Sequence, residues 1–292
     1  MTVDGLERAV AGELERAIVS MRPVAGGDIN LAFEAKLEGG ERVFVKTHPN
    51  APAGMFAAEA RGLAWLRESG ALRVPEVLAV SKPGVVGPSF LVLEFIEPGR
   101  RATAFEETLG RGLATMHRFG APRFGLDHDN FIGSLPQANE EGSSWADFYR
   151  DKRLAAQLDR AASRGLVGAP LRRDFDRLFE ELDVLVGPSE PPSRLHGDLW
   201  GGNLHVGERG EPCLIDPAAY GGHREVDLAM MRLFGGFGDR VFDAYDEAWP
   251  LADGHERRTS LYQLYPLLVH VNLFGGGYVG SVARALRDAI GR

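Results

Sequence analysis

The sequence predicts an α+β protein with two lobes, a small β-rich N-lobe followed by a larger and mostly helical C-lobe. Two observations support this prediction. Short apolar or alternating runs are concentrated near the N-terminus, whereas apolar residues at helical spacing dominate the rest of the chain. The 292 residues, 44% of them hydrophobic, are also enough to fill a core in each lobe. We place the N-lobe at residues 1–97 and the C-lobe at residues 98–292.

The N-lobe is expected to contain two helices and several strands. Leu6, Val10, Leu14 and Ile18 recur at four-residue spacing, which predicts a helix over residues 4–19. Strand patterns follow at residues 41–47, 74–80 and 89–95, and a second helix is expected at residues 54–68.

Lys46 ends the strand pattern ERVFVKT, and Glu59 follows thirteen residues later on the second predicted helix. A lysine at such a place is usually a solvated edge residue. A strand lysine with a carboxylate on the next helix indicates instead an ion pair that presents the ammonium group to phosphates. We expect a Lys46–Glu59 ion pair.

A glycine-rich turn separates the first two strands and contains Gly26, Gly27 and Asp28. The two glycines would let the backbone approach phosphates closely, with N–H groups pointing inward. Without further context, an ordinary glycine hairpin is the favoured interpretation of this turn.

The C-lobe is expected to be helical. Apolar periodicity predicts helices over residues 104–118, 145–162, 170–186, 227–234, 240–249, 257–274 and 279–290. Residues 119–143 are rich in Gly, Pro, Asn and Asp, so we expect a long ordered loop, of a kind that often borders a functional site.

Three polar side chains stand out around a predicted hairpin formed by residues 204–206 and 213–215. Asn203 begins the first strand and Asp216 follows the second, so the hairpin brings together an amide oxygen and a carboxylate, which suit Mg²⁺. Asp198 lies on the loop just before. Each residue alone could be turn chemistry. An Asp base, an Asn and a metal-binding Asp in this order are the arrangement used for phosphoryl transfer.

These segments carry a resemblance to a known family. HGDLWGGN followed by IDPAAYGGHREVDLAMMRLFGGF resembles the fructosamine/ketosamine kinases, which belong to the aminoglycoside phosphotransferase and choline kinase group with the protein-kinase-like fold. GGDIN, VFVK, DNFIGS and NLFGGGY extend the resemblance over nearly the whole chain. It implies an enzyme that uses ATP and Mg²⁺ to phosphorylate the sugar 3-hydroxyl of a ketosamine, which destabilises the adduct in a deglycation reaction.

The resemblance also implies roles for individual residues. Asp198 would be the general base, Asn203 and Asp216 would hold Mg²⁺, and Lys46 would neutralise phosphate charge. The glycine-rich turn would cover the nucleotide phosphates. The run at residues 89–95 resembles the hinge between two lobes, so backbone groups of three residues would bind adenine: Glu94, Phe95 and Ile96.

Supporting roles are expected around the catalytic loop. His196 could be taken for a second base, but its position favours a role in loop geometry. Asp227 is expected to form a hydrogen bond to the loop. Arg224 and Glu225 could act in the same way, or could be solvated charges at a helix start.

Trp200 lies in the catalytic loop beside two glycines. Its ring could stack on the apolar face of a sugar. The alternative is a packing residue that covers the loop.

Charge and cysteine content indicate which partners and which cellular location to expect. The net charge is −8, and no basic stripe points to nucleic acid. A single cysteine, Cys213, allows no intramolecular disulfide, and no signal peptide or membrane span is visible. We therefore expect a cytoplasmic monomer that acts on a small-molecule ketosamine or a glycated protein.

Two alternatives remain open at this point. The chain could be another small-molecule kinase of the same fold, acting on choline, an aminoglycoside or homoserine. An acceptor cleft rich in acidic side chains would favour a polycation. The chain could also be a nucleotide-binding pseudokinase, although the complete set of reactive residues argues against this.

Overall fold

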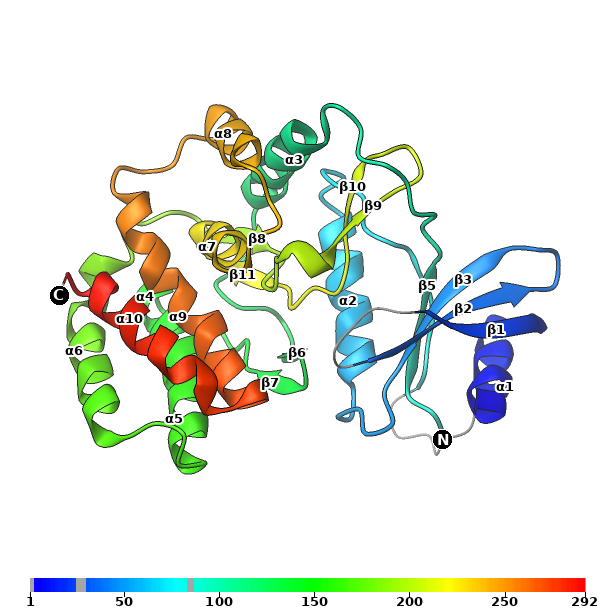
Figure 1. The fold of residues 1–292 in the computed structure, drawn as a ribbon, viewed down its shortest axis with the longest axis horizontal. Coiled ribbons are helices and arrows are strands. Elements are labelled where there is room, and N and C mark those ends of the chain that lie inside the picture. Colours follow the sequence, from blue (N-terminus) through cyan, green and yellow to red (C-terminus); the bar gives the residue numbers. More distant parts are fainter. Residues whose placement is uncertain (1–2, 25–29, 83–86, 292) are drawn as a thin grey trace.

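The structure is a computed structural model that describes residues 3–24, 30–82 and 87–291. It has the predicted protein-kinase-like architecture, with a β-rich N-terminal lobe and a larger helical lobe (Figure 1). In the part of the chain that is described, no helix is both long and apolar enough to cross a membrane. The predicted boundary between residues 97 and 98 stays a prediction.

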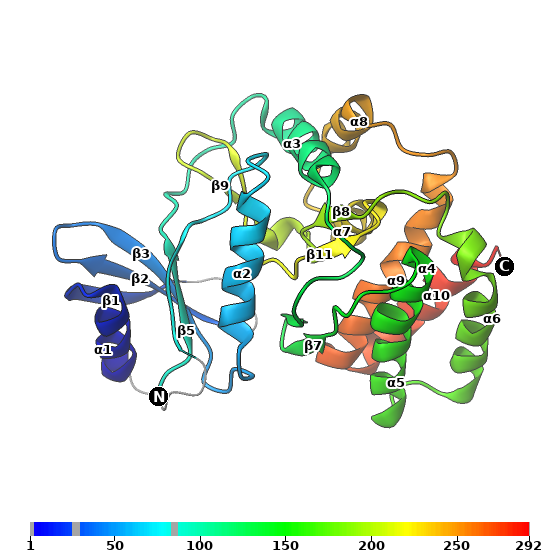
Figure 2. The same ribbon diagram turned by 180° about the vertical axis from the view of Figure 1, so that it is seen from behind.

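One antiparallel sheet of five strands forms the N-terminal lobe, in the order β1-β2-β3-β5-β4. The strands are β1 (Ile18–Val24), β2 (Leu31–Leu37), β3 (Arg42–Thr47), β4 (Val77–Val80) and β5 (Phe90–Glu94). Helix α1 (Val3–Leu14) packs on one face, and α2 (Met55–Arg67) lies between the sheet and the helical lobe in both ribbon views (Figures 1 and 2).

The side chains of β3 alternate between the two faces of the sheet. Val43 and Val45 are fully buried and join the cluster under α1. Because successive side chains of a strand point to opposite faces, Phe44 and Lys46 point toward the helical lobe. The same short strand therefore fills one core and supplies a lysine to the other side.

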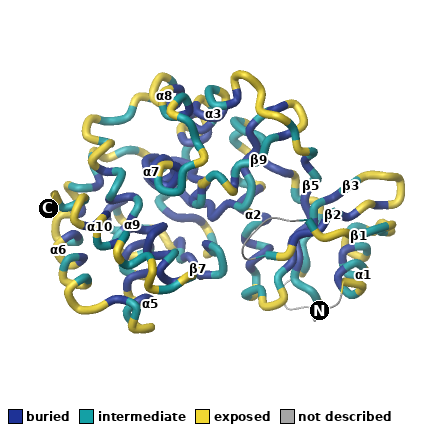
Figure 3. The backbone as a smooth tube through the Cα atoms, in the orientation of Figure 1, coloured by how far each residue is buried: buried dark blue, intermediate teal, exposed yellow. Residues whose placement is uncertain are grey.

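The C-terminal lobe is mostly helical. Its helices are α3 (Phe105–Phe119), α4 (Trp145–Phe148), a π-helical segment (Tyr149–Ala155), α5 (Ala156–Ser163), α6 (Ala169–Leu185), α7 (Glu225–Phe234), α8 (Asp239–Ala248), α9 (His255–Phe274), a short 3-10 turn (Gly276–Tyr278) and α10 (Val279–Ala289). In Figure 3, α7 is mostly buried, whereas α6 exposes much of its outer surface.

Three short strand pairs position loops in this lobe. They are β6 (Asn130–Ile132) with β7 (Leu135–Gln137), β8 (Ser193–Leu195) with β11 (Tyr220–Gly222), and β9 (Leu204–Val206) with β10 (Pro212–Leu214). The third pair is the predicted hairpin, shifted by one residue in its second strand. The β8–β11 pair was not predicted, and it joins the two ends of the segment that carries the candidate catalytic loop.

Three predicted elements differ from the structure. The first helix ends at Leu14, because Ile18 pairs with Leu37 in the sheet although it continues the apolar spacing of the helix. The predicted loop over residues 119–143 contains the β6–β7 hairpin. The predicted helix over residues 145–162 is helical throughout, but its middle turns are π-helical.

Candidate active site

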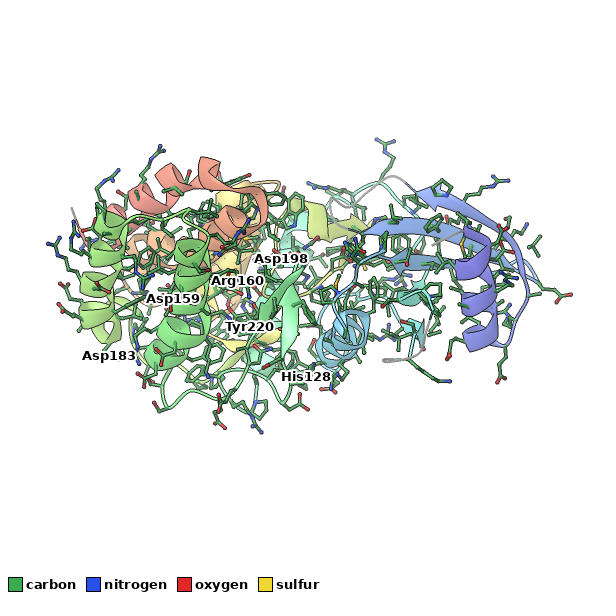
Figure 4. All side chains as sticks on the ribbon, turned by 90° about the horizontal axis from the view of Figure 1, so that it is seen from below. His128, Asp159, Arg160, Asp183, Asp198 and Tyr220 are labelled. Atoms are coloured by element: carbon green, nitrogen blue, oxygen red, sulfur yellow. The ribbon has the colours of Figure 1, made fainter. Side chains whose placement is uncertain are left out.

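The predicted site residues of the described chain gather in a cleft between the two lobes, with a volume of about 970 Å³. The cleft is lined by Lys46, Glu59, Glu94, Phe95, Ile96, Asp198, Trp200, Asn203 and Asp216, among other residues. Figure 4 shows Asp198 near the junction of the lobes, with Asp159 and Asp183 further out on the helical lobe. Gly26, Gly27 and Asp28 lie outside the described residues.

Lys46 is bound by two carboxylates. Its Nζ atom lies 2.7 Å from Oε1 of Glu59 and 2.8 Å from Oδ1 of Asp216. Only 4% of the lysine side chain is exposed, so a solvated edge residue is excluded. Burial alone would lower the pKa of Lys46, but the two carboxylates outweigh that effect and raise it above its ordinary value. Lys46 is therefore a buried cation that joins α2 to Asp216.

Asn203 and Asp216 flank the β9–β10 hairpin. The amide nitrogen of Asn203 donates to the backbone oxygen of Asp198 at 2.8 Å and to its Oδ2 at 3.2 Å. The backbone of Asp216 is left-handed, with φ of 55°, which is uncommon for a residue other than glycine and often found at functional sites. The three predicted polar residues therefore form one compact group.

This group suits a hard cation. A carboxylate from Asp216 and an amide oxygen from Asn203 are oxygen ligands of the kind that Mg²⁺ prefers. No cluster of three or more His, Cys, Asp or Glu residues that could hold a metal by itself occurs among the described residues. A cation bound here would therefore need further oxygen ligands, which the phosphates of a nucleotide can supply.

Asp198 has an unusual proton affinity. Burial in the cleft wall and the negative charge of Asp216 raise its pKa from 3.8 to about 7, although the hydrogen bond from Asn203 opposes the shift. Near neutral pH the carboxyl group of the ligand-free protein can thus take up or release a proton.

The loop before Asp198 is anchored by Asp227, which is fully buried at the start of α7. Its two carboxylate oxygens accept hydrogen bonds from the backbone N–H groups of His196 at 2.8 Å and Gly197 at 2.9 Å. Burial alone would raise the pKa of Asp227, but hydrogen bonds, first among them that from His117, lower it. A carboxylate that is ionised at neutral pH therefore fixes the path of the loop.

His196 has both ring nitrogens engaged. Nε2 lies 2.9 Å from the carbonyl oxygen of Ile215, and Nδ1 accepts from the backbone N–H of Asp198 at 3.3 Å. Burial lowers the pKa of His196, so the ring is neutral. It links the Asp198 loop to the residue before Asp216 and has no free nitrogen with which to act as a base.

His117 and Tyr245 complete this support and were not predicted. His117 on α3 lies 3.1 Å from Asp227 through Nε2 and 2.8 Å from the hydroxyl group of Tyr245 on α8 through Nδ1. The only signal in the sequence was a histidine within the apolar face of the helix predicted over residues 104–118.

Arg224 and Glu225 are buried and do not reach the Asp198 loop. Arg224 forms two hydrogen bonds of 2.8 Å to Glu190. Glu225 accepts two hydrogen bonds from Arg258, at 2.8 and 2.6 Å. The suggestion of solvated charges at a helix start is therefore wrong, and both residues act as buried ion pairs that fix the start of α7.

Trp200 is 38% exposed, and its ring covers the Cα atom of Gly202. A Cβ atom at Gly202 would lie 2.3 Å from the indole ring, so only glycine permits this position of the ring. Trp200 lines the cleft, as do several other apolar and aromatic residues of the helical lobe: Met230, Phe234, His270, Phe274 and Tyr278.

His270 is the centre of this aromatic group. Its ring centroid lies 4.5 Å from that of Phe234, 5.1 Å from Tyr278 and 5.3 Å from Phe274. Its Nδ1 atom bonds to the carbonyl oxygen of Pro266 at 2.8 Å, and burial lowers its pKa. A neutral ring that donates through Nδ1 keeps Nε2 as a hydrogen-bond acceptor. We refer to these rings and Trp200 as the aromatic wall.

The segment predicted to bind adenine lies at the end of β5 and lines the cleft. The backbone N–H of Glu94 already donates to the carbonyl oxygen of Glu76 at 2.8 Å. An adenine contact by Glu94 would therefore have to use its carbonyl oxygen, with Phe95 and Ile96 supplying the other backbone groups. Cys213, in contrast, is a buried core residue whose thiol pKa is raised to about 12 by burial.

Comparison with known proteins agrees with this geometry. The solved structure of a macrolide 2'-phosphotransferase from Brachybacterium faecium matches with a TM-score of 0.58 at 15% identity, covering 97% of both chains, which shows the shared fold. A candidate fructosamine-3-kinase from Thermobifida fusca matches with a TM-score of 0.90 at 38% identity over 100% of both chains.

Proteins with similar sequences are also named as kinases of sugar–amine adducts. The chloroplastic protein-ribulosamine 3-kinase of Arabidopsis thaliana is 39% identical over 282 residues, which is 93% of this chain and 82% of that protein. The family model for fructosamine kinase matches residues 6–292. The chain therefore belongs to the fructosamine kinase family.

Proposed function

We propose that the protein transfers the terminal phosphoryl group of ATP to a hydroxyl group on the sugar of a ketosamine. The observation that carries this proposal is the single cleft in which Lys46, Asp198, Asn203 and Asp216 meet the aromatic wall. The family and the name of the ribulosamine 3-kinase relative support the same reaction and favour the 3-hydroxyl group. A phosphate ester on that carbon, unlike the hydroxyl group, can leave as inorganic phosphate, and this would destabilise the sugar–amine adduct and so reverse glycation.

The nucleotide would lie along the N-lobe side of the cleft. Glu94, Phe95 and Ile96 would offer backbone groups to adenine, and Lys46 would neutralise charge on the phosphates. Asp216 and Asn203 would hold Mg²⁺, which shields the charge of the phosphates when bound. The glycine-rich turn with Gly26, Gly27 and Asp28 is proposed to cover the phosphates, on the basis of the sequence alone.

Asp198 would orient the acceptor hydroxyl group and accept its proton as the new P–O bond forms. Correct position matters more here than basicity, because the hydroxyl proton becomes acidic only during the transfer. The support from Asp227 and His196 fits such a demand, since it fixes the backbone that leads into the base.

The acceptor side of the cleft favours a sugar over a polycation. Its acidic lining residues in the described chain are Glu59, Glu94, Asp198 and Asp216, and all of them belong to the nucleotide or transfer region. An aminoglycoside with several ammonium groups would find aromatic rings where it needs carboxylates. Trp200 would instead give the apolar face of a sugar a flat surface.

The test is a panel of acceptors incubated with the protein and Mg-ATP. Fructoselysine, ribuloselysine, an aminoglycoside and choline are compared by ADP release and by the mass of the product. We expect an increase of one phosphoryl group on the ketosamines only. Phosphorylation of choline or the aminoglycoside alone would contradict the proposal, and a failure to turn over any acceptor would favour a pseudokinase.

The role of the metal has its own test. Asp216→Ala should abolish the Mg²⁺ dependence of nucleotide binding, because it removes the only carboxylate proposed as a ligand. Calorimetric titration with ATP at several Mg²⁺ concentrations measures this. An unchanged Mg²⁺ dependence would show that Asp216 is not a ligand.

Three expectations about the setting remain proposals. We propose that the protein acts as a monomer, that it works in the cytoplasm, and that residues 1–97 and 98–292 form the two lobes. Gel filtration with light scattering would test the first, and localisation of the tagged protein in its host would test the second.

A further inference from the structure

Arg73, in the connection between α2 and β4, is surrounded by three carboxylates. One guanidinium nitrogen lies 2.7 Å from Oε1 of Glu94. The other lies 2.8 Å from Oε2 of Glu208 and 2.5 Å from Oε1 of Glu211. Its side chain is 21% exposed, so the group is partly shielded from water. This cluster is separate from the compact group of Asp198, Asn203 and Asp216, which we call the transfer group.

The backbone of Arg73 contacts the same hairpin as its side chain. Its carbonyl oxygen accepts a hydrogen bond from the N–H of Leu214 at 2.9 Å, and Arg73 forms a parallel bridge with Cys213. Both neighbours belong to β10, and Asp216 follows two residues after Leu214. One residue therefore contacts the hairpin at its turn and near its end.

The carboxylates around Arg73 belong to two segments with different proposed tasks. Glu94 ends β5 and begins the segment proposed to bind adenine. Glu208 and Glu211 lie in the turn of the β9–β10 hairpin, whose two ends carry the proposed metal ligands. The guanidinium group thus bridges the adenine segment and the hairpin.

We propose that Arg73 is a positioning residue that sets the adenine segment and the metal-binding hairpin at the separation which one nucleotide requires. The proposal rests on the proposed function, because it assumes that adenine and the phosphates occupy these two places. A planar guanidinium group with several fixed donors can hold carboxylates on two segments at once, which a lysine cannot do in the same geometry.

A purely structural role explains less. Partly exposed ion pairs contribute little to the stability of a fold. The hairpin also has other attachments, since the N–H of Gly99 donates to Val206 at 2.9 Å and that of Ala102 donates to Gly210 at 3.0 Å. Without the Arg73 side chain the hairpin should stay docked and the metal group intact. What would be lost is the fixed position of Glu94 relative to the hairpin.

The experiment compares two ligands that use different parts of the cleft. Mg-ATP spans the adenine segment and the hairpin, whereas Mg-tripolyphosphate can use only the phosphate region. Both are titrated calorimetrically into the wild-type protein and Arg73→Lys, which keeps the charge. We expect Arg73→Lys to weaken ATP binding about tenfold, the equivalent of one charge-assisted hydrogen bond, and to leave tripolyphosphate binding within about twofold.

Matched variants guard against a simple loss of folding. Glu94→Gln changes the other end of the bridge and should weaken ATP binding selectively in the same way. Arg209→Met is the control, because Arg209 also approaches Glu211, at 3.7 Å, but is 78% exposed. It should leave the affinity for both ligands unchanged. Thermal unfolding of each variant without ligand checks that the fold is retained.

The outcomes distinguish a failure of the positioning role of Arg73 from a failure of the proposed function. An equal loss of ATP and tripolyphosphate binding, or no loss in Arg73→Lys and Glu94→Gln, would overturn the positioning role while leaving the kinase assignment in place. A wild-type protein that binds ATP no better than tripolyphosphate would overturn the adenine assignment, and the role of Arg73 with it.

Discussion

The two sides of the cleft are built from different chemistry. On the transfer side, ionised and amide groups contact one another at hydrogen-bond distance, as in the links from Lys46 to Glu59 and Asp216. On the side proposed to bind the acceptor, aromatic rings surround His270. The difference suggests that charge fixes the reaction, because phosphoryl transfer needs cations and a base in set places. Apolar faces would select the acceptor, because a neutral sugar offers C–H surfaces and hydroxyl groups.

The largest effect is expected from Asp198→Asn on the transfer side. The asparagine amide cannot take up the proton of the substrate hydroxyl group. Turnover should therefore fall by at least the ~10²–10⁴-fold typical of a lost general base. ATP affinity should hardly change, because the contacts proposed for the nucleotide come from other residues. Steady-state kinetics and ATP titration on one preparation measure both, and turnover near the wild-type rate would remove Asp198 from the reaction.

Trp200→Ala tests the acceptor side. Loss of the ring frees the sugar to misorient, and small misplacements can reduce a transfer rate about 10²-fold. We expect ketosamine turnover to fall roughly ten- to a hundredfold, with basal ATP hydrolysis nearly unchanged. Gly202→Ala should act in the same direction, because its Cβ atom would displace the ring.

The comparison for Trp200 depends on the ratio of two activities measured together. Equal losses of ketosamine turnover and ATP hydrolysis would mean that Trp200 only supports the loop. No loss of either would show that the ring lies outside the acceptor site.

A smaller and more selective effect is expected from Lys46→Ala. Loss of a cation beside the phosphates should raise the apparent KM for ATP about tenfold, the scale of one charged hydrogen bond, and change the KM for the ketosamine much less. Initial rates over a grid of both substrate concentrations separate the two constants. The opposite pattern would place Lys46 with the acceptor.

The smallest effect concerns stability. Ionisation of Asp198 is unfavourable in the ligand-free fold, since its pKa is raised from 3.8 to about 7. A carboxyl group whose pKa is raised by folding stabilises the fold at pH values below its pKa in the unfolded chain. This stabilisation is lost as the pH rises through its pKa in the folded protein. Asp198→Asn should therefore increase the free energy of unfolding at pH 8 by on the order of 1–3 kcal/mol, which raises the melting temperature by a few degrees. At pH 4 the substitution should hardly change it.

The control for this titration is the same pair of proteins with Mg-ATP. Burial is the main cause of the raised pKa of Asp198, and a cation on Asp216 would offset the second cause, the negative charge of Asp216, so the difference at pH 8 should shrink. Equal melting temperatures of the two ligand-free proteins at pH 8 would contradict the raised pKa.

Sequence reasoning succeeded best where the interacting residues are close in the chain. The β9–β10 hairpin, with Asn203 before it and Asp216 after it, follows from two short apolar runs and the turn between them. It failed where a distant partner overrode the local pattern. Ile18 fits the spacing of the first helix but pairs with Leu37, because pairing in the sheet satisfies its backbone groups while its side chain stays half-buried.

The sequence by itself determined the two-lobe order, the family resemblance and the three oxygen-bearing residues of the transfer group, because each rests on local spacing. Only the tertiary structure decided which rings form the aromatic wall and which carboxylates surround Arg73. Its partners Glu208 and Glu211 are 135 and 138 residues away in the chain. No local period relates residues at such separations, since their contact depends on how the hairpin packs against the connection that precedes β4.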